Sequence, residues 1–98
     1  DPYSSSLQQK FNEAYQKMIQ EFRTAESAYK QLVAASKGTS QEANAQLQLA
    51  SAAQISGDSK TAIDAYTRFL RIAPDSPNAQ AVRQTLAQLK ASTAQTQG

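Results

Sequence analysis

Apolar residues recur at intervals of three and four along most of this chain, which is the spacing of one face of an α-helix. The clearest case is the segment from Gly57 to Pro77, which reads GDSKTAIDAYTRFLRIAPDSP. Asp58 is suited to cap the first turn of a helix there, and the ring of Pro74 ends the hydrogen-bond ladder. We therefore predict a helix between them, against which the rest of the chain packs. Its apolar face comprises Ala62, Ala65, Tyr66, Phe69 and Leu70.

The segment from Leu7 to Ser36 contains neither Gly nor Pro, and its apolar residues follow a heptad spacing. Two structures fit: one long helix, or a hairpin of two shorter helices with a turn near Gln20 to Phe22. The unbroken heptad and the absence of turn residues favour the long helix. Residues 1–6 are expected to form a flexible lead-in, or a helix cap supplied by one of the serines. The stripe comprises Phe11, Tyr15, Met18, Phe22, Ala25, Tyr29 and Leu32.

Two further helices are predicted on either side of the central one. The first runs from about Gln41 to Ile55, after a break at Gly38, with Thr39 or Ser40 as its cap. The second begins at Pro77 after Ser76, reaches about Lys90 and leaves a polar, disordered tail over residues 92–98. The expected fold is all-α: one domain over residues 7–91, an antiparallel stack of four or five helices.

Composition and charge exclude several classes of function. Ten Lys and Arg against eight Asp and Glu give a net charge of +2, but the basic residues are spread from Lys10 to Lys90 without a phosphate-tracking stripe, so we expect no nucleic-acid partner. The chain has no Cys and no His, which removes thiol nucleophiles, disulfides and the usual zinc sites. We expect no cofactor, no metal and no enzymatic activity. No apolar run approaches the roughly 20 residues of a membrane span, so no direct membrane insertion is expected.

The chain also contains an internal repeat, because residues 22–36 match residues 59–73 at an offset of 37. Residues 43–77 resemble a tetratricopeptide repeat (TPR), although Gln46 and Ala53 stand where that motif usually has aromatic residues. Residues 7–36 would be a degenerate earlier repeat, and residues 77–90 the terminal capping helix. The residues that carry the resemblance are Leu49, Ala50, Gly57, Asp58, Ala62, Tyr66, Phe69 and Pro74.

The resemblance implies a fold of TPR type and a non-catalytic role as a protein-interaction module, with a concave groove that binds a peptide or protein. The groove residues that it implies are Asn44, Leu47, Gln48, Ser51, Gln54, Ile55 and Asn78.

The alternative is a homo-oligomerisation element, in which the N-terminal stripe forms the seam of a homodimer rather than part of the core. The candidate seam residues are Phe11, Tyr15, Phe22 and Tyr29. The wording FLRIAPDSPNAQAVRQTLAQL resembles bacterial repeat proteins of the periplasm or of a membrane anchor, which favours an extracytoplasmic scaffold. Because the chain opens with Asp1-Pro2 and not with Met, we expect a processed form or a piece of a longer protein.

Overall fold

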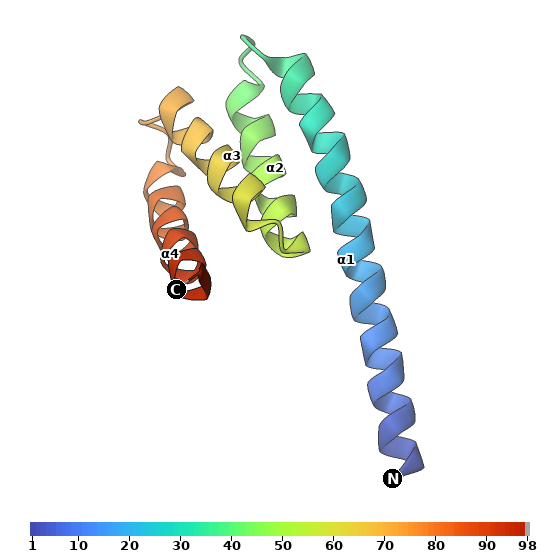
Figure 1. The fold of residues 1–98 in the computed structure, drawn as a ribbon. Helices are drawn as coiled ribbons and strands as arrows, with labels where there is room; N and C mark the ends of the chain where they lie inside the picture. The colour runs from blue at the N-terminus through green and yellow to red at the C-terminus, as the bar shows by residue number, and fades with distance from the viewer. Residues whose placement is uncertain (98) are drawn as a thin grey trace.

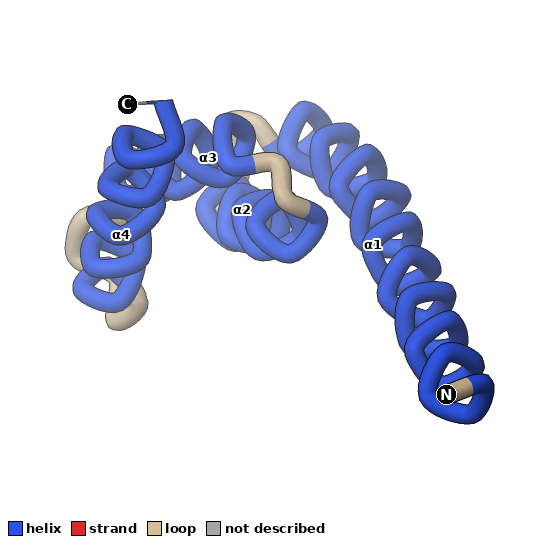
Figure 2. Tube along the Cα trace, turned by 60° about the horizontal axis from the view of Figure 1, so that its bottom comes forward, coloured by secondary structure: helices blue, strands red, loops and turns tan. Residues whose placement is uncertain are grey.

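Four antiparallel helices, each packed on the next, make up the structure (Figure 1). The computed structural model describes residues 1–97, with side chains described for residues 1–94. Within these residues there is no strand, and Cα atoms of different helices come within 8 Å only between consecutive helices. Seen from another side, the helices follow an arc from α4 to α1 (Figure 2). The predicted all-α stack is confirmed, with four helices. They are α1 (Pro2–Ser36), α2 (Glu42–Ser56), α3 (Ser59–Ile72) and α4 (Ala79–Gln97).

The first helix is continuous over 35 residues, so the long-helix alternative is the one that the structure adopts. At 1.5 Å per residue it is about 52 Å long, close to the 55 Å longest extent of the molecule. No turn interrupts it at Gln20 to Phe22. Residues 2–6 belong to this helix and not to a separate lead-in, and its cap is Asp1 and not a serine: Asp1 accepts a hydrogen bond from the Tyr3 amide at 3.1 Å, and Pro2 occupies the first turn.

The break between α1 and α2 forms at the predicted glycine. Gly38 has a φ of +80°, which a residue with a side chain adopts only with strain, and its amide donates to Glu42 Oε2 at 2.7 Å. Neither predicted cap is used, because the N-cap of α2 is Gln41 and no side chain caps the helix there; Thr39 Oγ1 accepts from the Gln41 amide at 3.2 Å within the turn that precedes it. These bonds reverse the chain within five residues and place α2 along the C-terminal half of α1.

The turn between α2 and α3 is as short as the sequence predicts. Gly57 is left-handed, with a φ of +87°, and Asp58 Oδ1 accepts from the Thr61 amide at 3.1 Å as the cap of α3. Hydrogen bonds from Thr61 lower the pKa of Asp58, and the one from its side chain has a larger effect than the one from its backbone. Burial opposes the shift. A connection of two residues leaves α2 and α3 no alternative to close antiparallel packing.

The core lies between α2, α3 and the first turns of α4, and it is rich in alanine. Small side chains let helix backbones approach closely, so few large residues are needed to fill the space. The hydroxyl of Tyr66 reaches the edge of this core and donates to Gln54 Oε1 at 2.9 Å. The central buried cluster comprises Leu49, Ala50, Ala53, Ala62, Ala65, Tyr66, Phe69, Val82 and Leu86.

The last helix begins and ends later than predicted. Ser76 Oγ accepts from the Asn78 amide, but the helix starts at Ala79 and not at Pro77, because the first bonded turn is the tighter Ser76–Ala79 turn. The helix continues to Gln97, so residues 92–97 do not form the separate disordered tail that was expected. Gly98 lies outside the described residues.

Candidate interaction surfaces

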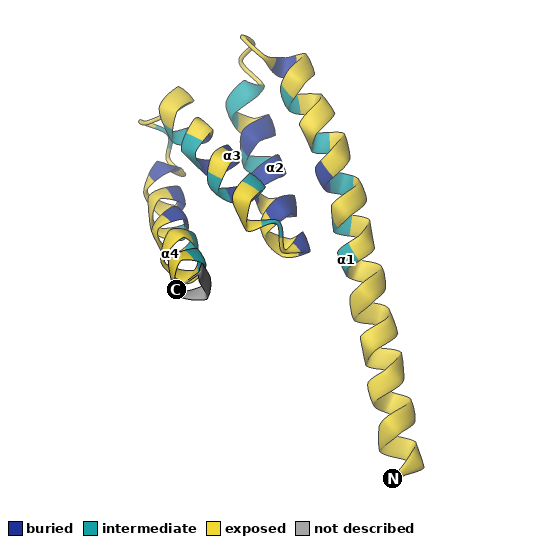
Figure 3. Cartoon of the chain, in the orientation of Figure 1, coloured by how far each residue is buried: buried dark blue, intermediate teal, exposed yellow. Residues whose placement is uncertain are grey.

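The N-terminal half of α1 carries a row of large apolar side chains that no other helix covers. Every residue from 1 to 18 is exposed, and Figure 3 shows this half of the helix projecting beyond α2, α3 and α4. We call the row the exposed stripe. Its members, with their exposed fractions, are Tyr3 (72%), Leu7 (51%), Phe11 (70%), Tyr15 (50%) and Met18 (38%).

The structure divides the predicted oligomer seam into two parts. Phe11 and Tyr15 belong to the exposed stripe, whereas Phe22 and Tyr29 are half-buried beside α2. The reason is length: α2 has 15 residues and spans about 22 Å, so it covers less than half of α1. The heptad stripe predicted from the sequence is therefore core in its C-terminal half and open surface in its N-terminal half.

A hollow of about 240 Å³ lies where the half-buried part of the stripe meets α2. Phe22 and Tyr29 form its α1 side, and Ala52 closes it on the α2 side together with three of the predicted groove residues. These three are Leu47, Gln48 and Ser51.

The other predicted groove residues lie outside this hollow. Asn44, Gln54 and Ile55 are exposed elsewhere on α2, and Gln54 is engaged by the hydroxyl of Tyr66. Asn78 is exposed in the turn before α4. Since α1 does not fold into a hairpin, the structure gathers only the central part of the predicted groove.

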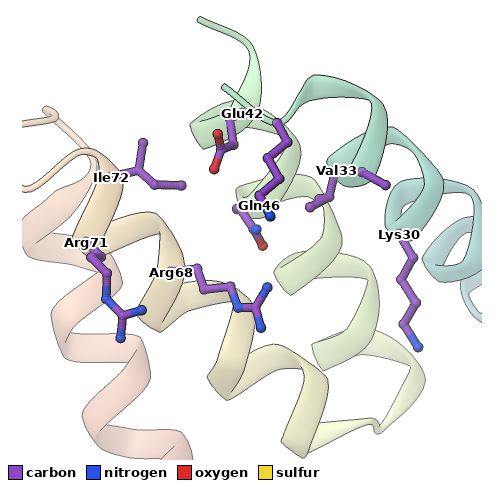
Figure 4. A pocket seen from close by; sticks show the side chains of 9 residues that line it. Lys30, Val33, Glu42, Gln46, Arg68, Arg71 and Ile72 are labelled. Carbon is purple, nitrogen blue, oxygen red and sulfur yellow. The ribbon is translucent and has the colours of Figure 1, made fainter. Parts of the chain in front are cut away.

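A second depression, which sequence reasoning missed, lies between the C-terminal ends of α1 and α3, over α2. Its volume is about 490 Å³, and Figure 4 shows Arg68 directed into it from α3. In the sequence, the only indication of this depression is the spacing of its basic residues: Lys37 follows Lys30 by seven positions, and Arg71 follows Arg68 by three. The lining residues are Lys30, Val33, Ala34, Lys37, Glu42, Gln46, Arg68, Arg71 and Ile72.

This depression is cationic, because its lining has four basic residues and one carboxylate, that of Glu42, which already accepts a hydrogen bond from the Gly38 amide; one of the four, Lys30, also forms an ion pair with Glu26. It is open to solvent, so its field is screened within about 8–10 Å at physiological salt. An exposed set of bases of this kind attracts anions weakly and without geometric selection.

One buried polar group fixes how α1 lies against α2. Glu26 is 8% exposed and accepts a hydrogen bond from Ser56 Oγ at 3.0 Å, while Lys30 lies 3.4 Å from its other oxygen. A carboxylate at a helix contact is stable only with such partners. Sequence reasoning did not find it, because its partner Ser56 is 30 residues away.

No group of three potential metal-ligating side chains gathers within the part of the chain that the structure describes. Among the same residues, no helix combines the length and the apolar character of a membrane span. Comparison with known proteins identifies no relative, because no family model, curated protein or solved structure matches the chain.

Proposed function

We propose that this chain is a non-catalytic protein-interaction module and that α1 presents its main binding surface. The observation that carries the proposal is the exposed stripe. At roughly 200 Å² for a large side chain, the exposed fractions of its five members amount to about 500 Å² of apolar surface. Monomeric soluble proteins rarely leave more than a few hundred Å² in one patch unless it is used for binding.

The geometry of the stripe fits recognition of another helix. Its members follow one another at steps of four, four, four and three residues, so they form one continuous face. Amphipathic helices bind partners through anchors at such intervals. The stripe leads directly to Phe22 and Tyr29 at the hollow, which extends the surface onto Leu47 of α2.

The resemblance to TPR proteins supports the same class of function. In such domains the first helices of successive repeats form a peptide groove, and the hollow beside Leu47, Gln48 and Ser51 occupies the corresponding side of α2. The absence of Cys and His from the sequence, which favours a non-catalytic role, agrees with this proposal.

Selection of displayed helical peptides on the intact protein would test the proposal. We expect peptides with apolar residues at intervals of three and four to be enriched, and to lose binding at least tenfold when Phe11→Ser and Tyr15→Ser are combined. The matched control combines Glu13→Ser and Lys17→Ser, which lie away from the stripe on the same helix. Peptides that bind all three proteins equally, or no enrichment at all, would refute the assignment of the surface to the stripe.

A second candidate function is homo-oligomerisation. It is favoured by one observation, namely that the heptad pattern runs without interruption from the uncovered half of α1 into the half that packs on α2. The same apolar face would then serve as a contact between copies of the chain.

A further inference from the structure

We infer that the exposed stripe is covered by a second copy of this chain, whose α1 lies antiparallel to the first and places its N-terminal half beside the hollow. The inference rests on the proposed function and names the partner of the same surface. The pairing would bring together two features that a single copy leaves open: the uncovered apolar N-terminal half of α1, and the hollow beside the C-terminal half of the same helix.

The heptad spacing defines the register of this pairing. Two antiparallel copies of α1 place Phe11 of one copy opposite Tyr29 of the other. The same alignment places Tyr15 opposite Ala25 and Met18 opposite Phe22. All three pairs share one midpoint, Gln20, so a single two-fold axis generates them and their symmetry mates. The face is therefore complementary to itself.

The hollow lies at the end of this register. Tyr29, the residue opposite Phe11 of the second copy, lines the hollow together with Leu47 and Gln48. An aromatic ring from the second copy would enter a space that is already bordered by apolar atoms of two helices. The contact thus extends beyond α1 and takes in three of the predicted groove residues.

A single copy cannot make these contacts. Phe11 and Tyr29 are 18 residues apart in one continuous helix, a distance of about 27 Å along its axis. A hairpin turn near residue 20 would bring them together, but α1 has no Gly or Pro there and stays helical. The antiparallel segment must therefore come from another molecule, as in helix exchange.

The core positions of the pairing carry no charge, because the residues that it places opposite one another are aromatic, Met or Ala. Of the charged residues within the uncovered half of α1, Glu13 and Lys17 lie away from the stripe, and Lys10 lies beside Leu7 near one end of it. A two-fold axis brings identical residues together, so like charges close to it repel one another. Glu21 lies next to the axis and faces its own symmetry mate, which weakens the pairing.

The area limits the strength of the dimer. About 500 Å² of apolar surface from each copy gives roughly 1,000 Å² in total, the lower end of specific protein interfaces. We therefore expect a weak, reversible dimer.

Cross-linking of introduced cysteines tests the register, since the chain has none of its own. Ala14→Cys and Ala28→Cys are both at exposed positions that flank the seam, and within one α1 they are about 21 Å apart. A bis-maleimide too short for that distance should link two chains of the double variant. The matched control, Glu13→Cys with Ser27→Cys, has the same separation on the outer face and should not be cross-linked.

Light scattering across a concentration series completes the test. The unmodified chain should approach the mass of a dimer, and Tyr15→Glu should weaken association at least tenfold while circular dichroism stays unchanged, because Tyr15 lies outside the buried core and is 50% exposed. A cross-link within one chain would reveal a hairpin, and it would overturn the inference. So would a monomer at every concentration.

The two proposals fail in different ways. If the chain is monomeric but helical peptides still bind through Phe11 and Tyr15, the second-copy inference is refuted and the interaction module stands. If stripe-dependent binding is absent as well, both are refuted.

Discussion

The contact of Glu26 with Ser56 provides the sharpest test of how α1 is held. Glu26→Ala removes one buried methylene group, worth about 0.8 kcal/mol, together with the carboxylate. It also removes the acceptor of a charged hydrogen bond, ordinarily about 1.5–3 kcal/mol. That loss is partial, because Ser56 Oγ also bonds to the Ala53 carbonyl oxygen at 3.1 Å and keeps that acceptor.

The ion pair with Lys30 adds little, since the Lys30 side chain is 55% exposed and such pairs contribute up to about 0.5 kcal/mol. Together the losses predict that Glu26→Ala lowers the free energy of unfolding by about 1.5–3 kcal/mol. Glu26→Gln keeps the shape and one acceptor oxygen, so we expect a cost under about 1 kcal/mol.

Urea denaturation followed by circular dichroism measures both values, at protein concentrations low enough to avoid association. Glu21→Ala, at an exposed position of the same helix, is the control and should stay within about 0.5 kcal/mol of the unmodified chain. The reasoning is refuted if Glu26→Ala costs less than about 1 kcal/mol. It is also refuted if Glu26→Gln costs as much as Glu26→Ala, because charge and not packing would then dominate.

Three further predictions concern the turn and the core. Asp58→Ala should lower the free energy of unfolding by about 1 kcal/mol at neutral pH. Because the pKa of Asp58 is lowered in the fold, this loss of stability relative to the unmodified chain should shrink as pH falls below about 4. A loss that stays constant down to about pH 2 would contradict the argument. Gly57→Ala should cost about 1–2 kcal/mol in thermal denaturation from its φ of +87° alone, since an added Cβ meets no atom within 4 Å, and an unchanged midpoint would exclude the strain. Tyr66→Phe should cost about 0.5–1 kcal/mol in urea, and Gln54→Ala should add nothing further if the two groups act only on each other.

The ends of the helices were largely predictable, because they depend on residues close together in the chain. Gly57 and Asp58 form the turn that their chemistry requires, and Gly38 breaks the chain where expected. The start of α4 was predicted two residues early, since Ser76 and Pro77 form a tight turn before the regular helix. Local rules locate a helix end to within such a margin.

The candidate surfaces were predictable only in part. The spacing of Leu47, Gln48 and Ser51 put them on one side of a helix, and the structure gathers them beside Phe22 and Tyr29. The basic depression around Arg68 and the buried Glu26 both join side chains of different helices. The periodicity of a single helix does not predict contacts between side chains of different helices.

By itself, the sequence determined the helical class, the turns and the apolar face of each helix, since backbone preferences and side-chain spacing act over a few residues. Only the tertiary structure decided which part of the α1 face is core and which is surface. Heptad positions from Phe11 to Leu32 are equivalent in the sequence, but α2 is too short to cover them all. Burial depends on what packs opposite a residue, and that is a property of the whole fold.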